Sequence, residues 1–254
     1  MKQFVLPSDC PTQLELSGGD FHYLHTVRRL GPGDSFAGID ADGQRYHVTI
    51  QELYGERLLV QVLPAGSAAS DLPAVHLYQC IPKGGKFDQV VRMATEAGAA
   101  SITPVLSERT IVRIDQADIS KKCRRWERII QEAVQQSGSL QVPRLYPPIT
   151  LQGLLQRKTE EGMLFFHQAP LAPASLHQYC SQTLAAVGIC IGPEGGFSPG
   201  EVQAMQAAQW HPGYLGPWVL RTEHAGMYAI AAVHTILLER AQWNLQNVTG
   251  TELT

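Results

Sequence analysis

The sequence has no long apolar run. No segment approaches the roughly 20 consecutive apolar residues that a membrane-spanning helix needs, and the apolar stretch from Ala225 to Val233 stops at His234. The first residues, Met1 to Pro7, contain no apolar core long enough for a secretory signal. We therefore expect a cytoplasmic protein without a membrane segment.

Cysteine is scarce, and metal-binding motifs are missing. The five cysteines are scattered and none forms a Cys-x-x-Cys pair, so we expect buried reduced thiols rather than disulfides or a zinc site. His22 and His25 are three residues apart, but no further ligand lies near them in the sequence. No His-Glu-x-x-His motif is present either. The sequence therefore predicts no metal site.

Positive charge is in slight deficit. The net charge is −3, from 20 basic and 23 acidic residues, which excludes a protein that holds nucleic acid by bulk positive charge. The charge is distributed unevenly, because residues 1–72 carry a net −4, residues 73–145 a net +4 and residues 146–254 a net −3. A local basic face in the middle third is therefore compatible with the overall balance.

The first part of the chain is typical of short strands joined by tight turns. Three strand-forming segments, of which two flank an Asp-Gly turn, lie at residues 34–39, 45–50 and 57–63. A short helix is expected from Asp20 to Leu30. This spacing favours a small barrel. The small and polar residues 64–71 indicate a linker and a domain boundary near residue 72.

Beyond that boundary the pattern predicts alternating strands and helices. Strands are expected at residues 75–80, 101–106, 163–166 and 187–191. Apolar residues recur at helical spacing from Phe87 to Ala97, and Ser120 is expected to cap a helix that ends at Gly138. Because the last two strands are almost wholly apolar, we expect them in a mainly parallel sheet of an α/β domain.

Two loops carry the most information about function. The first, residues 191–201, is a glycine-rich turn after a buried strand, followed by a helix that Ser198 and Glu201 cap. Open α/β sheets bind ligands at such strand ends. The second, residues 214–226, precedes a helix expected from Glu223 to Trp243 that is apolar almost all round. Either loop alone is also compatible with a purely structural turn or, for its charges, a surface ion pair.

Together the two loops resemble the motifs of SPOUT-class RNA methyltransferases, specifically the RsmE-type family that methylates N3 of a uridine in 16S ribosomal RNA. The matching motifs are Ile-Gly-Pro-Glu-Gly-Gly-Phe-Ser at 191–198 and Leu-Gly-x-x-Val-Leu-Arg-Thr-Glu at 215–223. Shorter matches lie at residues 27–34, 83–88, 102–109 and 136–138. The resemblance therefore extends over nearly the whole chain and keeps the order of its motifs.

The resemblance implies an N-terminal PUA-like β-barrel that binds RNA, residues 1–72, and a trefoil-knotted methyltransferase domain, residues 73–254. It further implies a homodimer that packs through the last helix, and S-adenosylmethionine (SAM) as the cofactor. The residues that it assigns to the SAM pocket are Phe166, His167, Ile191, Gly192, Pro193, Glu194, Gly195, Gly196, Leu215, Gly216, Leu220 and Thr222.

Arg221 and Glu223 are the catalytic candidates. Because uracil N3–H is a weak acid, the site has to remove that proton or stabilise the developing anion. Arg221 would stabilise negative charge on a uracil carbonyl oxygen, while Glu223 or a water would accept the proton. A carboxylate with an ordinary pKa is a poor base for this step unless it is buried.

The cations of the middle third are candidate RNA contacts. Residues 121–128 include five lysines and arginines, which is also typical of the solvated face of an amphipathic helix. Beside a methyltransferase pocket, a phosphate-contacting face is the competing interpretation. The expected partner is 16S ribosomal RNA or the small ribosomal subunit. The candidate RNA-binding residues are Arg28, Arg29, Lys83, Lys86, Arg109, Lys121 and Arg125, with Arg113 as an extension.

Three positions depart from the family pattern. His224 stands in place of a usual threonine, and Trp218 and Ser139 stand in place of arginines. The lost arginines concern RNA contacts more than the SAM pocket. Other interpretations are a related SPOUT methyltransferase with another RNA target and a non-catalytic RNA-binding protein without SAM affinity. A third, another nucleotide-cofactor enzyme, is disfavoured because Gly-x-Gly-x-x-Gly and Gly-Lys-Ser/Thr motifs are missing.

Overall fold

The structure is a computed structural model that describes residues 3–67, 73–112, 115–157, 160, 162–171, 173–180 and 184–240. Contacts between residues divide the chain into two compact units. The first unit combines Met1–Ala69 with Glu127–Arg144, and the second combines Ser70–Trp126 with the chain from Leu145 onward. The first change of unit lies close to residue 72. The division of the chain into an RNA-binding domain and a methyltransferase domain stays a prediction.

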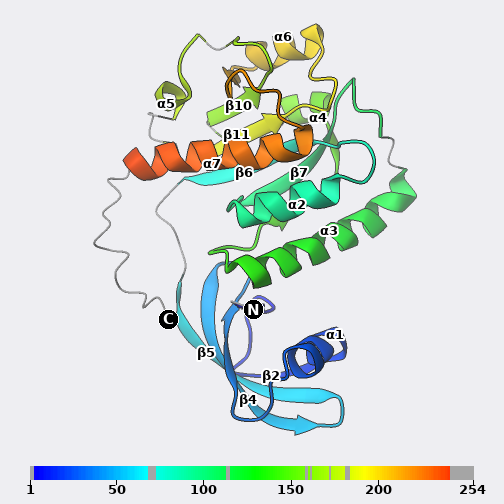
Figure 1. Ribbon diagram of the computed structural model, residues 1–254, viewed down its shortest axis with the longest axis vertical. Coiled ribbons are helices and arrows are strands. Elements are labelled where there is room, and N and C mark those ends of the chain that lie inside the picture. The colour runs from blue at the N-terminus through cyan, green and yellow to red at the C-terminus, as the bar shows by residue number, and fades with distance from the viewer. Residues whose placement is uncertain are drawn as a thin grey trace. The chain divides into compact units, whose positions relative to one another are not determined.

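The first unit contains a curled, five-stranded sheet (Figure 1). Its strands, in spatial order, are β1 (Phe4–Val5), β3 (Ser35–Ile39), β4 (Gln44–Tyr54), β5 (Arg57–Ser67) and β2 (Gln13–Ser17). The expected barrel is therefore an open half-barrel, with β1 and β2 at its edges. Its core contains the buried side chains of Phe4, Leu24, Val48, Leu58 and Val60.

Two local predictions for this unit are adjusted by the structure. The short helix begins at α1 (Gly18–Phe21) and continues as a π-helical turn over His22–Val27. The linker predicted from residue 64 begins too early, because β5 continues to Ser67. Pro64 is tolerated in the strand because it lies beside an irregularity in the pairing with β4, and the Gln44 side chain donates to the Gly66 carbonyl at 2.7 Å. Residues 68–72 lie outside the described part.

The second unit contains the α/β sheet that was predicted. Its spatial order is β12-β10-β11-β6-β7-β8, and β9 also pairs with β7. The pairs among β6, β7, β9, β10, β11 and β12 are all parallel. The strands are β6 (Ala74–Cys80), β7 (Ser101–Leu106), β8 (Arg144–Leu145), β9 (Ile149–Thr150), β10 (Gly162–Phe166), β11 (Ala186–Ile191) and β12 (His211–Gly213). The knot itself stays a prediction of the family resemblance.

Helices cover both faces of this sheet (Figure 1). Cys80, Phe165 and Cys190 form one core with residues of α4 (Leu151–Leu155) and α6 (Pro199–Ala207). On the opposite face, α7 (Thr222–Arg240) packs against β6 and β11 and also contacts α2 (Phe87–Glu96). The alternation of side chains along parallel strands produces these two apolar faces. The remaining helices are α3 (Gln116–Ser137) and α5 (Leu176–Tyr179).

Among the helices predicted beyond residue 72, one start is wrong. The predicted helix with Ser120 as its cap is wrong at its N-terminus, because α3 begins at Gln116, five residues before the predicted first helical residue. Asp118 is favourably placed at the helix N-terminus in this first turn, a signal that the choice of Ser120 as the cap overlooked. Gly138 ends α3 with φ of 73°, as predicted. The predicted end of α7 at Trp243 and the candidate Arg113 lie outside the described residues.

Three of the five cysteines, Cys80, Cys180 and Cys190, are buried, whereas Cys10 and Cys123 are partly exposed. Among the described residues, no group of three or more His, Cys, Asp or Glu side chains is arranged to hold a metal ion. No helix in the described part of the chain is long and apolar enough to cross a membrane.

Candidate active site

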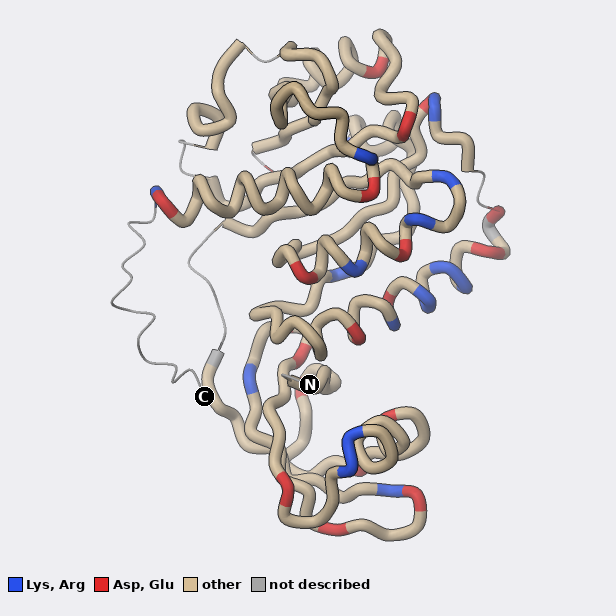
Figure 2. The backbone as a smooth tube through the Cα atoms, viewed as in Figure 1, with Lys and Arg blue, Asp and Glu red and all other residues tan. Residues whose placement is uncertain are grey.

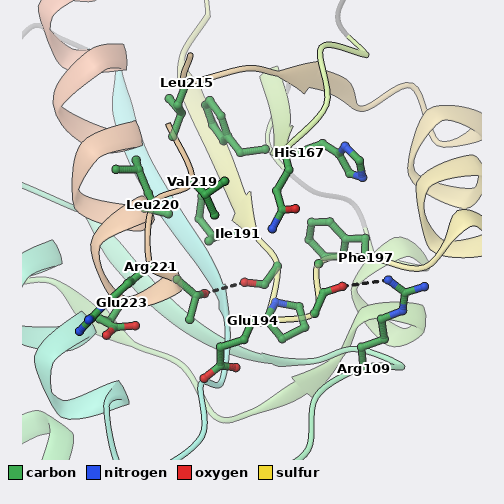
Figure 3. A pocket seen from close by; sticks show the side chains of 18 of the residues that line it. Arg109, His167, Ile191, Glu194, Phe197, Leu215, Val219, Leu220, Arg221 and Glu223 are labelled. Atoms are coloured by element: carbon green, nitrogen blue, oxygen red, sulfur yellow. Dashed lines mark hydrogen bonds between the residues drawn. The ribbon is translucent and has the colours of Figure 1, made fainter. Parts of the chain in front are cut away.

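A pocket of about 520 Å³ lies in the second unit, where β10 and β11 end (Figure 3). Three segments form most of its wall, namely residues 166–168, residues 191–197 and the approach to α7 from residue 215. Ligands bind at the carboxyl ends of strands in open α/β sheets. All twelve residues predicted for the SAM pocket line this cavity, as do Arg221 and Glu223.

The glycine-rich loop after β11 is shaped by its own sequence. A tight turn is closed by the Gly196 N–H, which donates to the Pro193 carbonyl at 2.9 Å, and Gly196 has φ of 65°, which glycine adopts without strain. The predicted capping box is present, since Ser198 Oγ accepts from the Glu201 N–H at 3.2 Å and Glu201 Oε2 from the Ser198 N–H at 2.8 Å. This cap begins α6 and so fixes where the loop ends.

Neighbouring segments hold the loop from outside. Arg109 Nη1 donates to the Gly195 carbonyl at 2.8 Å, as Figure 3 shows. The Lys83 N–H donates to Glu194 Oε1 at 3.1 Å. The loop is therefore braced by the two segments that follow β6 and β7.

Glu223 is the most buried charged group of the pocket. Its side chain is only 3% exposed, and Oε1 lies 3.0 Å from the Lys86 ammonium. Burial raises the pKa of Glu223, but its own backbone N–H, Lys86 and His224 together outweigh burial and hold the pKa below its usual value. Oε2 is buried without a hydrogen-bond partner. The carboxylate is therefore charged at neutral pH and retains one unused acceptor.

Arg221 does not form an ion pair with Glu223. It is exposed at the pocket wall, and within the described chain no ion pair is found for its guanidinium. Figure 3 places Arg221 and Glu223 on the same side of the cavity, with Arg109 on another side. The interpretation of these charges as an ordinary surface ion pair is therefore wrong for Glu223, whose partner is Lys86.

The candidate RNA-binding residues separate into different environments. Lys86 and Arg109 line the pocket and hold Glu223 and Gly195, respectively. Arg125 binds Asp88, with Nε and Nη2 at 2.8 and 2.5 Å from Oδ2. Figure 2 shows further basic positions along α3. The side chains that are exposed without a described ion pair are Arg28, Arg29, Lys83 and Lys121.

Sequence reasoning left out five residues of the pocket wall. They are Gln168, Phe197, Trp218, Val219 and Ala225. Phe197 and Val219 belong to the two loop motifs, so the motifs already contained the signal. Trp218 is 73% exposed. His224, which stands in place of a threonine usual in the family, has a contact with α2. Its Nε2 lies 3.2 Å from Gln89 Nε2.

Comparison with known proteins identifies the class first. Residues 70–234 match the family model described as an RNA methyltransferase domain. A methyltransferase from Legionella pneumophila, solved in complex with the cofactor SAM, has 29% identity and a TM-score of 0.83, and the match covers 92% of this chain and 97% of that one. The chain therefore has the fold of an RNA methyltransferase of the SPOUT class.

Two further relatives narrow this class. The ribosomal RNA small subunit methyltransferase E of Synechocystis is 31% identical over 229 residues, which cover 87% of this chain and 73% of the relative. The structure of the Neisseria gonorrhoeae enzyme of that name, bound to SAM, has 27% identity and a TM-score of 0.80, and covers 93% of this chain and 98% of that one. The chain belongs to the ribosomal RNA small subunit methyltransferase E family.

Proposed function

We propose that this protein uses SAM to methylate N3 of a uridine in the 16S ribosomal RNA of the small subunit. The observation that carries the proposal is the pocket, in which the residues of both family motifs meet around Arg221 and Glu223. Methylation at N3 forms an N–C bond, breaks the S–CH₃ bond of SAM and releases the N3 proton.

The pocket fits the cofactor chemically. Its volume of about 520 Å³ lies within the usual range for small-molecule sites. Ile191, Leu215 and Leu220 supply an apolar wall, which suits adenine. The unpartnered Oε2 of Glu223 requires a hydrogen-bond donor, and SAM and uracil both carry one. No phosphate-binding motif is needed for a cofactor without phosphate.

Arg221 is proposed as the catalytic residue that stabilises the uracil anion. Its guanidinium is exposed at the pocket wall next to Glu223 and can approach a carbonyl oxygen of the base. A donor directed at developing charge lowers the barrier most when it is already in place. The alignment of the two reactants in the pocket adds to this effect.

Glu223 is less suited to the role of general base. A lowered pKa makes a carboxylate a weaker proton acceptor, and Lys86 already occupies one of its oxygens. We therefore favour a water as the acceptor of the N3 proton. Glu223 would hold the Lys86 ammonium in the pocket wall and accept a hydrogen bond from a bound reactant through Oε2.

RNA binding is proposed to use exposed cations of the second unit, such as Lys83 and Lys121, together with Arg28 and Arg29 of the first. Phosphate contacts of this kind position a substrate without selecting its sequence. An enzyme that acts on ribosomal RNA would work in the cytoplasm.

A homodimer is proposed from exposed apolar side chains at the pocket wall and on α7. Trp218 and Val219 are 73% and 79% exposed, and Tyr228 on α7 is 45% exposed. Exposed apolar patches on a protein surface mark interaction sites. Light scattering coupled to gel filtration tests this, and a monomer at micromolar concentration contradicts it.

Mass spectrometry of ribosomal RNA nucleosides tests the proposed function directly. A strain without this gene should lose N3-methyluridine from 16S ribosomal RNA, and the intact gene should restore it. Unchanged N3-methyluridine in the deletion strain contradicts the assigned substrate. Calorimetry with SAM separates a methyltransferase with another target, which binds SAM, from a non-catalytic RNA-binding protein, which does not.

A further inference from the structure

A buried chain of hydrogen bonds connects three segments around the pocket. Gln79, in β6, donates from Nε2 to Thr222 Oγ1 at 3.1 Å. Thr222 Oγ1 in turn donates to the Gly192 carbonyl at 2.6 Å, which Figure 3 marks with a dashed line. Gln79 is 0% and Thr222 6% exposed, so water does not readily replace these partners. Thr222 and Gly192 line the pocket, whereas Gln79 does not.

Gln79 sets the direction of this chain. Its Nε2 also donates to the Cys80 carbonyl at 3.2 Å, and a reversed amide would place two oxygens against each other there. The nitrogen therefore faces Thr222, and the Thr222 hydroxyl has to use its single proton for the Gly192 carbonyl. In the sheet Gln79 lies opposite Ile191, the residue that precedes Gly192.

The presence of a glutamine at this position needs a reason. Its Oε1 is buried without a hydrogen-bond partner, which is unfavourable, and an apolar side chain would avoid that cost. Gly226 of α7 makes room for this amide, because a Cβ there would lie 2.7 Å from Gln79 Oε1. The feature that offsets the unpartnered oxygen is the hydrogen bond that Nε2 donates to Thr222.

We propose that Gln79 is a positioning residue for the SAM pocket. Acting through the Thr222 hydroxyl, it fixes the Gly192 carbonyl and so holds the glycine-rich loop in register with the start of α7. The inference rests on the proposed function, because it assumes that SAM occupies this pocket. In this proposal the Thr222 hydroxyl links the glycine-rich loop to the start of α7.

The first test compares variants of the hydroxyl. Thr222→Val removes the link at nearly constant volume, and we expect SAM to bind about tenfold more weakly. Thr222→Ser keeps the hydroxyl and should restore most of the affinity. Thr95→Val is the matched control, since Thr95 is also buried but its hydroxyl donates to the Val91 carbonyl within α2. Calorimetry below each variant's unfolding temperature provides the dissociation constants.

The second test changes Gln79, which does not line the pocket. Gln79→Leu should raise the KM for SAM about tenfold while kcat at saturating SAM changes by less than about threefold. The double variant Gln79→Leu/Thr222→Val should bind SAM no more weakly than Thr222→Val alone, because both remove one link. Gly226→Ala, which displaces the Gln79 amide, should act in the same direction.

Three results would overturn this role. The first is a Gln79→Leu variant that binds SAM as tightly as the wild type. The second is a double variant in which the losses of SAM affinity of the two single variants multiply. The third is a Thr95→Val variant that loses as much SAM affinity as Thr222→Val. If Gln79→Leu does not fold, Gly226→Ala and the Thr222 pair decide the question by the same criteria. Failure of the proposed function looks different, since the wild-type protein itself would then not bind SAM.

Discussion

The cations of this protein form two groups that differ in what holds them. At the pocket, Lys86 binds the buried Glu223 and Arg109 binds a loop carbonyl. On α3, Lys121 and Arg124 are exposed and no described ion pair engages them. The sequence is more basic along α3 than around Lys86 or Arg109, so charge density alone does not identify the cations that build the site.

The two groups of cations differ in how much their charges contribute to folding. An exposed cation keeps its hydration and contributes little to folding. Lys86, in contrast, neutralises a carboxylate that burial has separated from water, so each member of that pair depends on the other. Changes in the pocket group should therefore affect catalysis and stability, and changes in the α3 group should affect RNA affinity.

The largest expected effect belongs to Arg221, the pocket cation whose guanidinium has no described hydrogen bond or ion pair. Arg221→Ala should slow single-turnover methylation by about 10²–10³-fold, because it removes a donor to the developing anion. SAM affinity should change little. Arg221→Lys keeps the charge but loses the planar fork and should be intermediate. Unchanged methylation in Arg221→Ala, with SAM still bound, would show that Arg221 has no catalytic role.

A smaller effect on stability is expected from Lys86. Lys86→Met leaves the Glu223 carboxylate buried without its cation, and we expect a loss of about 1–2 kcal/mol at pH 7, because the pair is partly screened by solvent. The lowered pKa of Glu223 means that its stabilising charge is present above its ordinary pKa of 4.5 and is lost as the pH falls through the lowered value.

The difference between wild type and Lys86→Met should therefore shrink in acid. Urea unfolding at pH 7 and at about pH 3.5 measures both free energies. Lys86→Met/Glu223→Gln should recover part of the loss at pH 7, since no unpaired charge remains. If the free energies of unfolding of wild type and Lys86→Met differ by the same amount at both pH values, the Lys86–Glu223 pair does not stabilise the protein through the charge of Glu223.

The α3 group should affect RNA affinity and its salt dependence. Replacing Lys121 and Arg124 with alanine should weaken RNA binding several-fold and reduce the slope of log K against log salt by about one to two. SAM affinity should not change. Arg125→Ala is the matched control, because Asp88 already holds its guanidinium. If Arg125→Ala reduces the salt dependence of RNA binding as much as the Lys121 and Arg124 replacements do, an ion pair with Asp88 does not keep a cation from contacting RNA.

The features that could be predicted from the sequence depend on residues that lie close together in the chain. Buried strands, the capping box at Ser198 and the residues that line the pocket follow from local pattern or from motifs. The partner of Glu223 does not, because Lys86 is remote in sequence and meets it only when α2 and α7 pack together. The link from Gln79 to Thr222 was missed for the same reason. A chain's local pattern also carries no signal for a knot.

The smallest effect concerns His234, a partly buried histidine of α7. His234 Nδ1 lies 3.1 Å from the Ala97 carbonyl, and burial, only partly opposed by this hydrogen bond, lowers its pKa from 6.5. The unfolded chain then binds the proton more tightly, so stability is full above pH 6.5 and declines as the pH falls below it. His234→Asn should remove less than about 1 kcal/mol of that dependence. Urea unfolding between pH 7 and 5 checks this, and a variant with the wild-type slope would assign the acid sensitivity to other groups.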